Sequence, residues 1–146
     1  MNDIVMDNVF GAMMYKHRWI KEEVVVLLGK EWHVKIVAKA YSGKPITMQQ
    51  QEAYKWFCEN LKENDIIIFE NTSKYINSHN LEFAQYWDGA RNIKTVKELA
   101  DIITLKTILF TQDGAVQILC ECPWDENGIA IQLRPTIEVG GQDMFL

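Results

Sequence analysis

The stretch of residues 105–146, LKTILFTQDGAVQILCECPWDENGIAIQLRPTIEVGGQDMFL, decides the fold. It opens with a β-rich run over residues 105–111, in which Ile108 and Phe110 share one face, and then reaches Asp113-Gly114. Asp-Gly between two β-rich runs predicts a hairpin, because glycine adopts positive φ angles freely and aspartate tolerates them. We therefore expect this stretch to form short antiparallel strands joined by turns.

Alternating polarity marks the strands that follow the hairpin turn, because apolar side chains at every second position give a strand one buried face. The residues predicted to face the core are, strand by strand, Val116, Ile118, Cys120 and Cys122, then Ile129, Ile131 and Leu133, then Ile137 and Val139. The residues predicted to face water are Gln132, Arg134, Thr136 and Glu138. Pro123 removes a backbone donor, so residues 123–128 are expected to form a longer, solvated connection. Gly140-Gly141 is expected to be a flexible corner, and residues 144–146 an apolar anchor.

The amino-terminal third predicts a three-strand meander. Its strands are expected over residues 9–15, 23–28 and 32–40. The run of residues 24–28 is apolar at every position, which suggests a central strand or one covered on both sides. In the third strand, Trp32, Val34, Ile36, Ala38 and Ala40 alternate with polar residues and are expected to face inward.

Helical spacing replaces the strand pattern in the middle of the chain. Thr47 and Gln50 match a capping box, and the apolar stripe behind them predicts a helix over residues 48–62. A second helix is expected from about residue 64, although residues 66–69 fit a strand equally well. Thr95 and Glu98 repeat the capping signal before a short third helix. The aromatic residues Phe83, Tyr86 and Trp87 of the segment between are expected to pack back onto the body.

This order of elements predicts an α+β fold. An amino-terminal three-strand meander and a carboxyl-terminal four-strand meander form antiparallel sheet, and two or three central helices pack on one face. The 146 residues fit a single domain over residues 1–146. No apolar run reaches the roughly 20 residues that a membrane helix needs. The three cysteines and the absence of a secretory signal pattern predict a cytoplasmic protein without disulfides.

No catalytic or metal-binding signature is present in the sequence. The net charge of −5 and the scattered lysines and arginines disfavour nucleic-acid binding. Cys58 and the three histidines are dispersed, and Cys120 and Cys122 are more typical of small buried hydrophobic residues than of metal ligands. We therefore expect no catalytic residue, no metal and no cofactor.

The strongest candidate for a binding site is the segment Trp124-Asp125-Glu126. A tryptophan among acidic residues on a turn is typical of a protein-partner anchor. The alternative, which is favoured, is that the ring folds over the end of the sheet and covers the core, since a large ring gains more from burial.

The chain resembles a family of small uncharacterised bacterial cytoplasmic proteins, a domain-of-unknown-function family with a carboxyl-terminal Trp-Asp hairpin. The resemblance depends on residues 108–114, 120–130 and 140–146, with similarity also at residues 9–11 and 51–57. The family loop after the Trp-Asp pair is longer and contains a histidine, which Asn127-Gly128 replaces here. The resemblance implies a bacterial setting and relatives among toxin-immunity and similar accessory genes.

Three functions are compatible with these observations. The first is a non-catalytic binding module that docks a protein partner, such as an immunity protein that neutralises a basic toxin by charge complementarity. The second is a structural protein that forms a homodimer through a sheet edge or the Phe83–Trp87 segment. The third is an enzyme whose site is assembled from dispersed residues. We rank the binding module first and the enzyme last.

Overall fold

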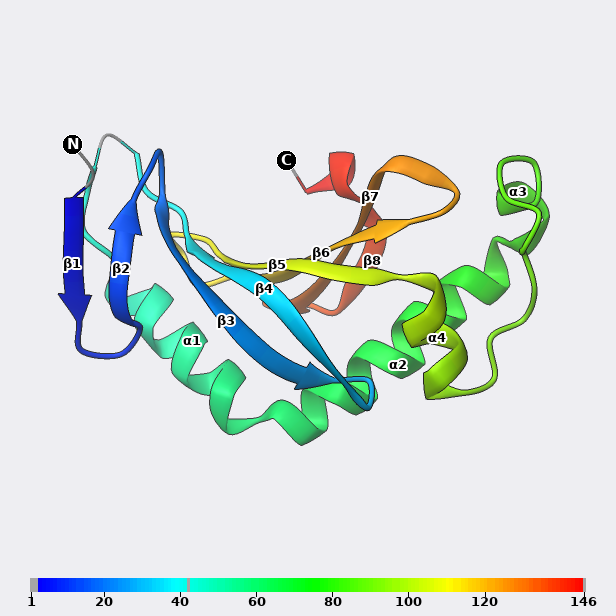
Figure 1. The fold of residues 1–146 in the computed structure, drawn as a ribbon, viewed down its shortest axis with the longest axis horizontal. Helices are drawn as coiled ribbons and strands as arrows, with labels where there is room; N and C mark the ends of the chain where they lie inside the picture. Colours follow the sequence, from blue (N-terminus) through cyan, green and yellow to red (C-terminus); the bar gives the residue numbers. More distant parts are fainter. Residues whose placement is uncertain (1–2, 42, 146) are drawn as a thin grey trace.

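The computed structural model describes residues 3–41 and 43–145, and its central feature is one eight-stranded sheet. Each strand lies beside its neighbour in the chain, in the order β1 to β8 (Figure 1). All neighbouring strands are antiparallel except β4 and β5, which are parallel. The fold is therefore α+β, as predicted, and two antiparallel meanders meet at one parallel junction.

The amino-terminal meander contains four strands, not the three that were predicted. They are β1 (Asp3–Asp7), β2 (Gly11–Tyr15), β3 (Trp19–Leu27) and β4 (Lys30–Ala38). The missed strand β1 pairs with β2 through a turn that Asp7 closes by accepting the backbone N–H groups of Val9 and Phe10. Of the two alternatives for residues 24–28, the central strand is confirmed, because β3 lies between β2 and β4, and cover on both sides is wrong, because Val24 and Val26 are exposed.

The carboxyl-terminal meander contains the four predicted strands. They are β5 (Thr104–Phe110), β6 (Val116–Cys122), β7 (Asp125–Arg134) and β8 (Glu138–Gly141), followed by the short 3-10 helix η1 (Gln142–Met144). The Gly140-Gly141 pair lies inside β8 opposite Ala130 and Ile129, so it is not a flexible corner. The expected apolar anchor is also wrong at Met144, which is exposed, and Leu146 lies outside the described residues.

Helices α1 (Met48–Glu59) and α2 (Leu61–Ser78) run along one face of the sheet, and α3 (Asn80–Phe83) and α4 (Val96–Ile102) follow them (Figure 1). The capping box of Thr47 and Gln50 forms as predicted. Helix α2 begins earlier than predicted and includes residues 66–69. Ile68 in this run is fully buried and Ile66 is exposed, which is the result of helical rather than strand periodicity. None of the helices in the described ranges is both long and apolar enough to cross a membrane.

Gln50 joins the first helix to the parallel junction of the sheet. Its side-chain amide donates to the carbonyl oxygen of Lys39 (2.7 Å), which follows the last residue of β4, and to that of Phe110 (3.0 Å), which is the last residue of β5. Its carbonyl oxygen accepts the backbone N–H of Thr47 at 2.9 Å. A parallel pair of strands needs a crossover connection, and Gln50 fixes where that crossover starts.

The hydrophobic core lies between the helices and one face of the sheet. Ile118, Cys120, Ile129 and Ile131, which the alternation turned inward, are all fully buried there. Gln132, predicted to face water, is buried on the opposite face, where its side chain accepts a hydrogen bond from Gln117. The strand alternation was therefore correct over β6 and β7 except that Gln132 is not solvated, and it was wrong at Ile137, which was predicted to face inward and is exposed.

A single row of residues crosses the uncovered face from edge to edge, through the pairing register of all eight strands. The row consists of Ile4, Met14, Ile20, Val37, Leu109, Gln117, Gln132 and Glu138. Val37 and Leu109 at its centre are buried although they lie outside the main core. Toward β1 the row is apolar and increasingly exposed.

Candidate functional site

The β6–β7 hairpin places the predicted segment Trp124-Asp125-Glu126 at one end of the molecule. The connection is a two-residue turn, Pro123-Trp124, between Cys122 and its strand partner Asp125. The longer, solvated connection that was predicted does not form. Gly128 belongs to β7 with a φ of +77°, and a β-carbon there would overlap the carbonyl oxygen of Cys120. Only glycine therefore fits this position of the hairpin.

Trp124 is buried in the structure, with 7% of its surface exposed. Its ring stacks on Phe83 with centroids 4.4 Å apart and planes inclined by 12°, and it also contacts Trp87 at 5.7 Å. This is the alternative in which the ring folds inward over the end of the sheet. Asp125 is half-buried and Glu126 is exposed, so the surface of this segment is acidic rather than aromatic.

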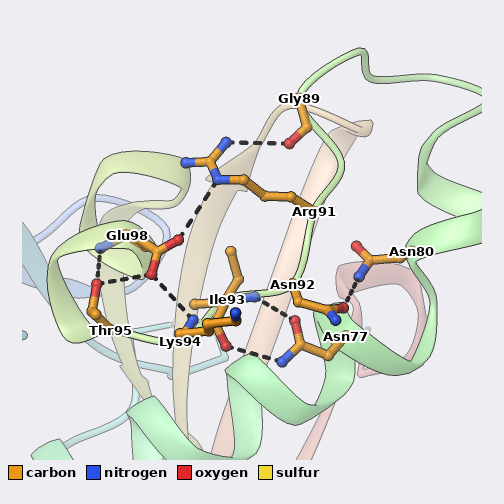
Figure 2. Close-up of polar contacts among 9 residues, drawn as sticks. All are labelled: Asn77, Asn80, Gly89, Arg91, Asn92, Ile93, Lys94, Thr95 and Glu98. Atoms are coloured by element: carbon orange, nitrogen blue, oxygen red, sulfur yellow. Dashed lines mark hydrogen bonds and ion pairs between the residues drawn. The ribbon is translucent and has the colours of Figure 1, made fainter.

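The segment that supplies Phe83 and Trp87 is tied down at both ends, as Figure 2 shows for residues 77–98. The side chain of Asn77 accepts the backbone N–H of Ile93 (2.6 Å) and donates to its carbonyl oxygen (3.0 Å). Asn80 donates to the side chain of Asn92 at 2.6 Å. These bonds hold residues 77–80 beside residues 92–93, so the aromatic residues of the segment between them have a fixed position.

The start of α4 completes this tether (Figure 2). Thr95 caps the helix by accepting the backbone N–H of Glu98, as predicted. The Glu98 carboxylate accepts from the backbone N–H of Lys94 and lies 3.8 Å from the Arg91 guanidinium. The pKa of Glu98 is lowered, first by its hydrogen bond from the Thr95 hydroxyl and also by Arg91.

Ionisable groups gather beneath the hairpin, around the phenol of Tyr75. The pKa of Tyr75 is raised, first by burial and then by electrostatic interaction with Glu82, Cys122 and Asp125. Burial also raises the pKa of the Cys122 thiol to about 11. The thiol and the phenol therefore stay protonated at neutral pH, which makes them poor nucleophiles. Glu82 of α3 and Asp125 of β7 both act on the Tyr75 phenol through their charge.

The surface above this cluster combines apolar and acidic side chains. Leu81 is 90% exposed and Tyr86 is 69% exposed, so the prediction that Tyr86 packs back onto the body is wrong. Phe83, between them, is buried against Trp124. We call the surface formed by Leu81, Glu82, Tyr86, Asp88, Asp125 and Glu126 the hairpin end. Sequence reasoning missed Leu81, because a single exposed leucine has no periodic signal.

A second cluster of reactive groups lies between β3 and α1, and sequence reasoning missed it. The Lys21 amine donates to the Tyr54 hydroxyl (2.8 Å), and that hydroxyl donates to Glu23 (3.0 Å). Lys21 and Glu23 also form an ion pair at 3.1 Å. Burial raises the pKa of Tyr54, with the charges of Cys58 and Glu23 acting in the same direction. Each of these groups is bonded to another in the cluster, which is typical of a structural network.

Hollows on the surface hold few groups suited to catalysis. One of about 380 Å³ is lined by Glu52, Asp113 and Arg134 at the turn after β5. A smaller one of about 190 Å³ on the uncovered face includes Glu22, Glu23 and His33, but Glu23 already accepts from Tyr54. Within residues 3–41 and 43–145, no three His, Cys, Asp or Glu side chains are grouped so that they could hold a metal ion.

Comparison with known proteins identifies the family of the chain. The comparisons with curated proteins and with solved structures gave no match. The model of the family described as Domain of unknown function (DUF6985) matches residues 9–146, which span the whole sheet except β1 and include the hairpin end. The expected membership in a domain-of-unknown-function family is thus confirmed, and the chain belongs to the family Domain of unknown function (DUF6985).

Proposed function

We propose that the protein is a non-catalytic, cytoplasmic protein-binding module that docks a basic protein partner through the hairpin end. The observation that carries the proposal is the stack of Trp124 on Phe83. This stack brings Asp125 and Glu126 of the hairpin next to a segment that exposes Leu81 and Tyr86. Exposed apolar side chains surrounded by charged groups have the anatomy of an interface core with its polar rim.

The charge of the hairpin end indicates the chemistry of the partner. The hairpin end contains four acidic residues, Glu82, Asp88, Asp125 and Glu126, and the whole chain has a net charge of −5. A basic surface would be attracted to this end over long range and would then bury the two apolar side chains. Tyrosine is also among the residues that contribute most at interfaces.

The finer proposal is that the protein is a bacterial immunity protein and that its partner is a basic toxin. The resemblance to relatives among toxin-immunity genes supports it, as does the acidic surface, which suits a toxin that itself binds nucleic acid. In this role Trp124 is a positioning residue that holds Asp125 and Glu126 in place, and it does not contact the partner.

Affinity purification from the native host with three forms of the full chain tests the proposal. The forms are the wild type, the double variant Leu81→Ala/Tyr86→Ala, and the control Met48→Ala, which removes an equally exposed side chain from α1. We expect the wild type and the control to retain the same basic protein, and the double variant to lose it. Co-expression with that protein should then relieve its toxicity only for the wild type and the control.

Two results would contradict the proposal. One is recovery of the same proteins with the double variant as with the wild type, since the hairpin end would then play no part. The other is a retained partner that is acidic. Circular dichroism on each form shows whether the double variant is folded, which is expected because both replaced side chains are exposed.

A further inference from the structure

Strand β1 forms an open edge at the opposite end of the molecule from the hairpin end (Figure 1). Its only neighbour in the described sheet is β2, so the backbone groups along its other side point away from the sheet. Such an edge is a ready template for pairing with a further strand. Proteins usually protect these edges with charges, prolines, bulges or a covering segment.

The middle of β1 carries none of these protective features. Ile4 is 70% exposed and Met6 is 74% exposed on the uncovered face, and Val5 is exposed on the other face. The opposite edge of the sheet is different, because β8 is only four residues long and the Met144 side chain lies over Gly140. β1 is therefore the longer and more apolar of the two edges.

Charges stand only at the two ends of β1, and both are negative. Asp3 is exposed at the start of the strand. Asp7 ends the strand, and the backbone N–H groups of Val9 and Phe10 and the amide of Gln51 hold its carboxylate in place. The strand thus has an apolar centre between two acidic ends, of which Asp7 is held in place.

This pattern disfavours a second copy of the chain as the occupant of the edge. Antiparallel pairing of two β1 strands around Val5 would place Asp3 of each copy opposite Asp7 of the other. Like charges directly opposite each other destabilise a strand pair, and this arrangement contains two such pairs. A strand with basic residues at both ends would instead form two opposite-charge pairs at the same positions.

An added strand would also complete the apolar row of the uncovered face. Ile4 lies opposite Met14, and Met14 lies opposite Ile20 beside a hollow of about 340 Å³. An apolar side chain placed opposite Ile4 would extend this row by one strand. It would cover Ile4 and Met6, which no segment in the described ranges covers.

We propose that β1 is a docking edge for an extended, basic segment of a partner protein. The segment adds a ninth, antiparallel strand, with apolar residues opposite Ile4 and Met6 and with lysine or arginine opposite Asp3 and Asp7. This surface shares no residue with the hairpin end, so it is a separate site from the one proposed above.

Titration of the full, ¹⁵N-labelled chain with short blocked peptides tests this inference. The basic probe is acetyl-Lys-Val-Thr-Val-Lys-amide, and the matched acidic probe is acetyl-Glu-Val-Thr-Val-Glu-amide. We expect the basic probe to shift the amide resonances of β1 and β2 and to bind at least tenfold more tightly than the acidic probe. Its affinity should fall with rising salt, because the two end pairs are exposed.

Variants of β1 distinguish binding by strand addition from nonspecific electrostatic attraction of the basic peptide. Ile4→Lys places a positive charge in the apolar centre and should abolish binding of the basic probe. Met6→Lys is a second variant with the same expectation, and both replaced side chains are exposed, so the fold should be kept. Val26→Lys adds the same charge elsewhere on the uncovered face and should retain binding.

Three results would overturn the inference. The first is equal binding of the two probes, or no binding of either. The second is a set of shifts confined to the hairpin end. The third is a dimer in analytical ultracentrifugation that Ile4→Lys converts to monomer, because the occupant of the edge would then be a second copy. If the basic peptide does not bind β1 but Leu81→Ala/Tyr86→Ala still loses its partner in the purification, this inference is wrong and the hairpin end remains the docking site.

Discussion

Replacement of Gln50 by leucine should destabilise the protein strongly, although the two side chains have nearly the same size. Gln50 is fully buried, and its amide makes three hydrogen bonds to backbone groups where α1 meets the ends of β4 and β5. Leucine fills the space but can make none of them. The parallel junction that holds the two meanders together would therefore lose its polar anchor.

The size of the effect follows from the partners that are left behind. The carbonyl oxygen of Phe110 keeps a second bond, from the backbone N–H of Lys39. The carbonyl oxygen of Lys39 and the backbone N–H of Thr47 lose the bonds to Gln50. Each buried group without a partner costs about 1–3 kcal/mol, and Thr47 is partly open to water, so we expect a loss of about 3 kcal/mol. For a chain of this length that lowers Tm by about 6–12 °C.

Urea unfolding followed by tryptophan fluorescence measures this loss. Gln49→Leu is the matched control, because Gln49 is the preceding residue of the same helix and is exposed. Its unfolding free energy should stay within about 0.5 kcal/mol of the wild type. If Gln50→Leu and Gln49→Leu unfold at the same urea concentration, the reasoning about the junction is refuted.

Three further outcomes are expected. Trp124→Ala should lower the free energy of unfolding by about 3–5 kcal/mol, because the ring is buried in a stack, and a urea midpoint equal to that of the wild type would contradict this. Burial raises the pKa of the Cys122 thiol from 9.0 to about 11, so between these values the folded chain keeps a proton that the unfolded chain loses. The free energy of unfolding should therefore fall as the pH rises from 9.0 to about 11, and it should fall less steeply in Cys122→Ala. If the wild type and Cys122→Ala lose stability in parallel over this range, the thiol is not buried as described. Asn77→Ala should speed amide hydrogen exchange at Ile93 by about tenfold, since it removes the acceptor of that amide, and an unchanged rate would count against the tether.

The local pattern of the sequence determined most of the secondary structure. Alternating polarity located β5, β6 and the inward faces of β7, and the capping residues Thr47 and Thr95 located the starts of two helices. These features depend on residues a few positions apart, so they can be read without knowing the fold. Strand β1 was missed because it is exposed at nearly every position and shows no buried face.

The sequence marked the hairpin segment as the candidate site, but it could not decide which side chains reach the surface. Trp124 is buried because Phe83 and Trp87 are brought against it, whereas Tyr86 of the same segment is exposed. Val24 and Val26 are exposed because none of the helices in residues 3–41 and 43–145 crosses their side of the sheet. Each of these outcomes depends on contacts between residues far apart in the chain.

By itself, the sequence determined most of the strands, the starts of two helices, the α+β class and the acidic character of the chain, because short-range periodicity and composition suffice for these. The tertiary structure alone decided that the two meanders join into one sheet at a parallel junction. It also decided that β1 is left as an open edge and that Trp124 turns inward. The physical reason is that burial is a property of packed surfaces, which form only when distant segments meet.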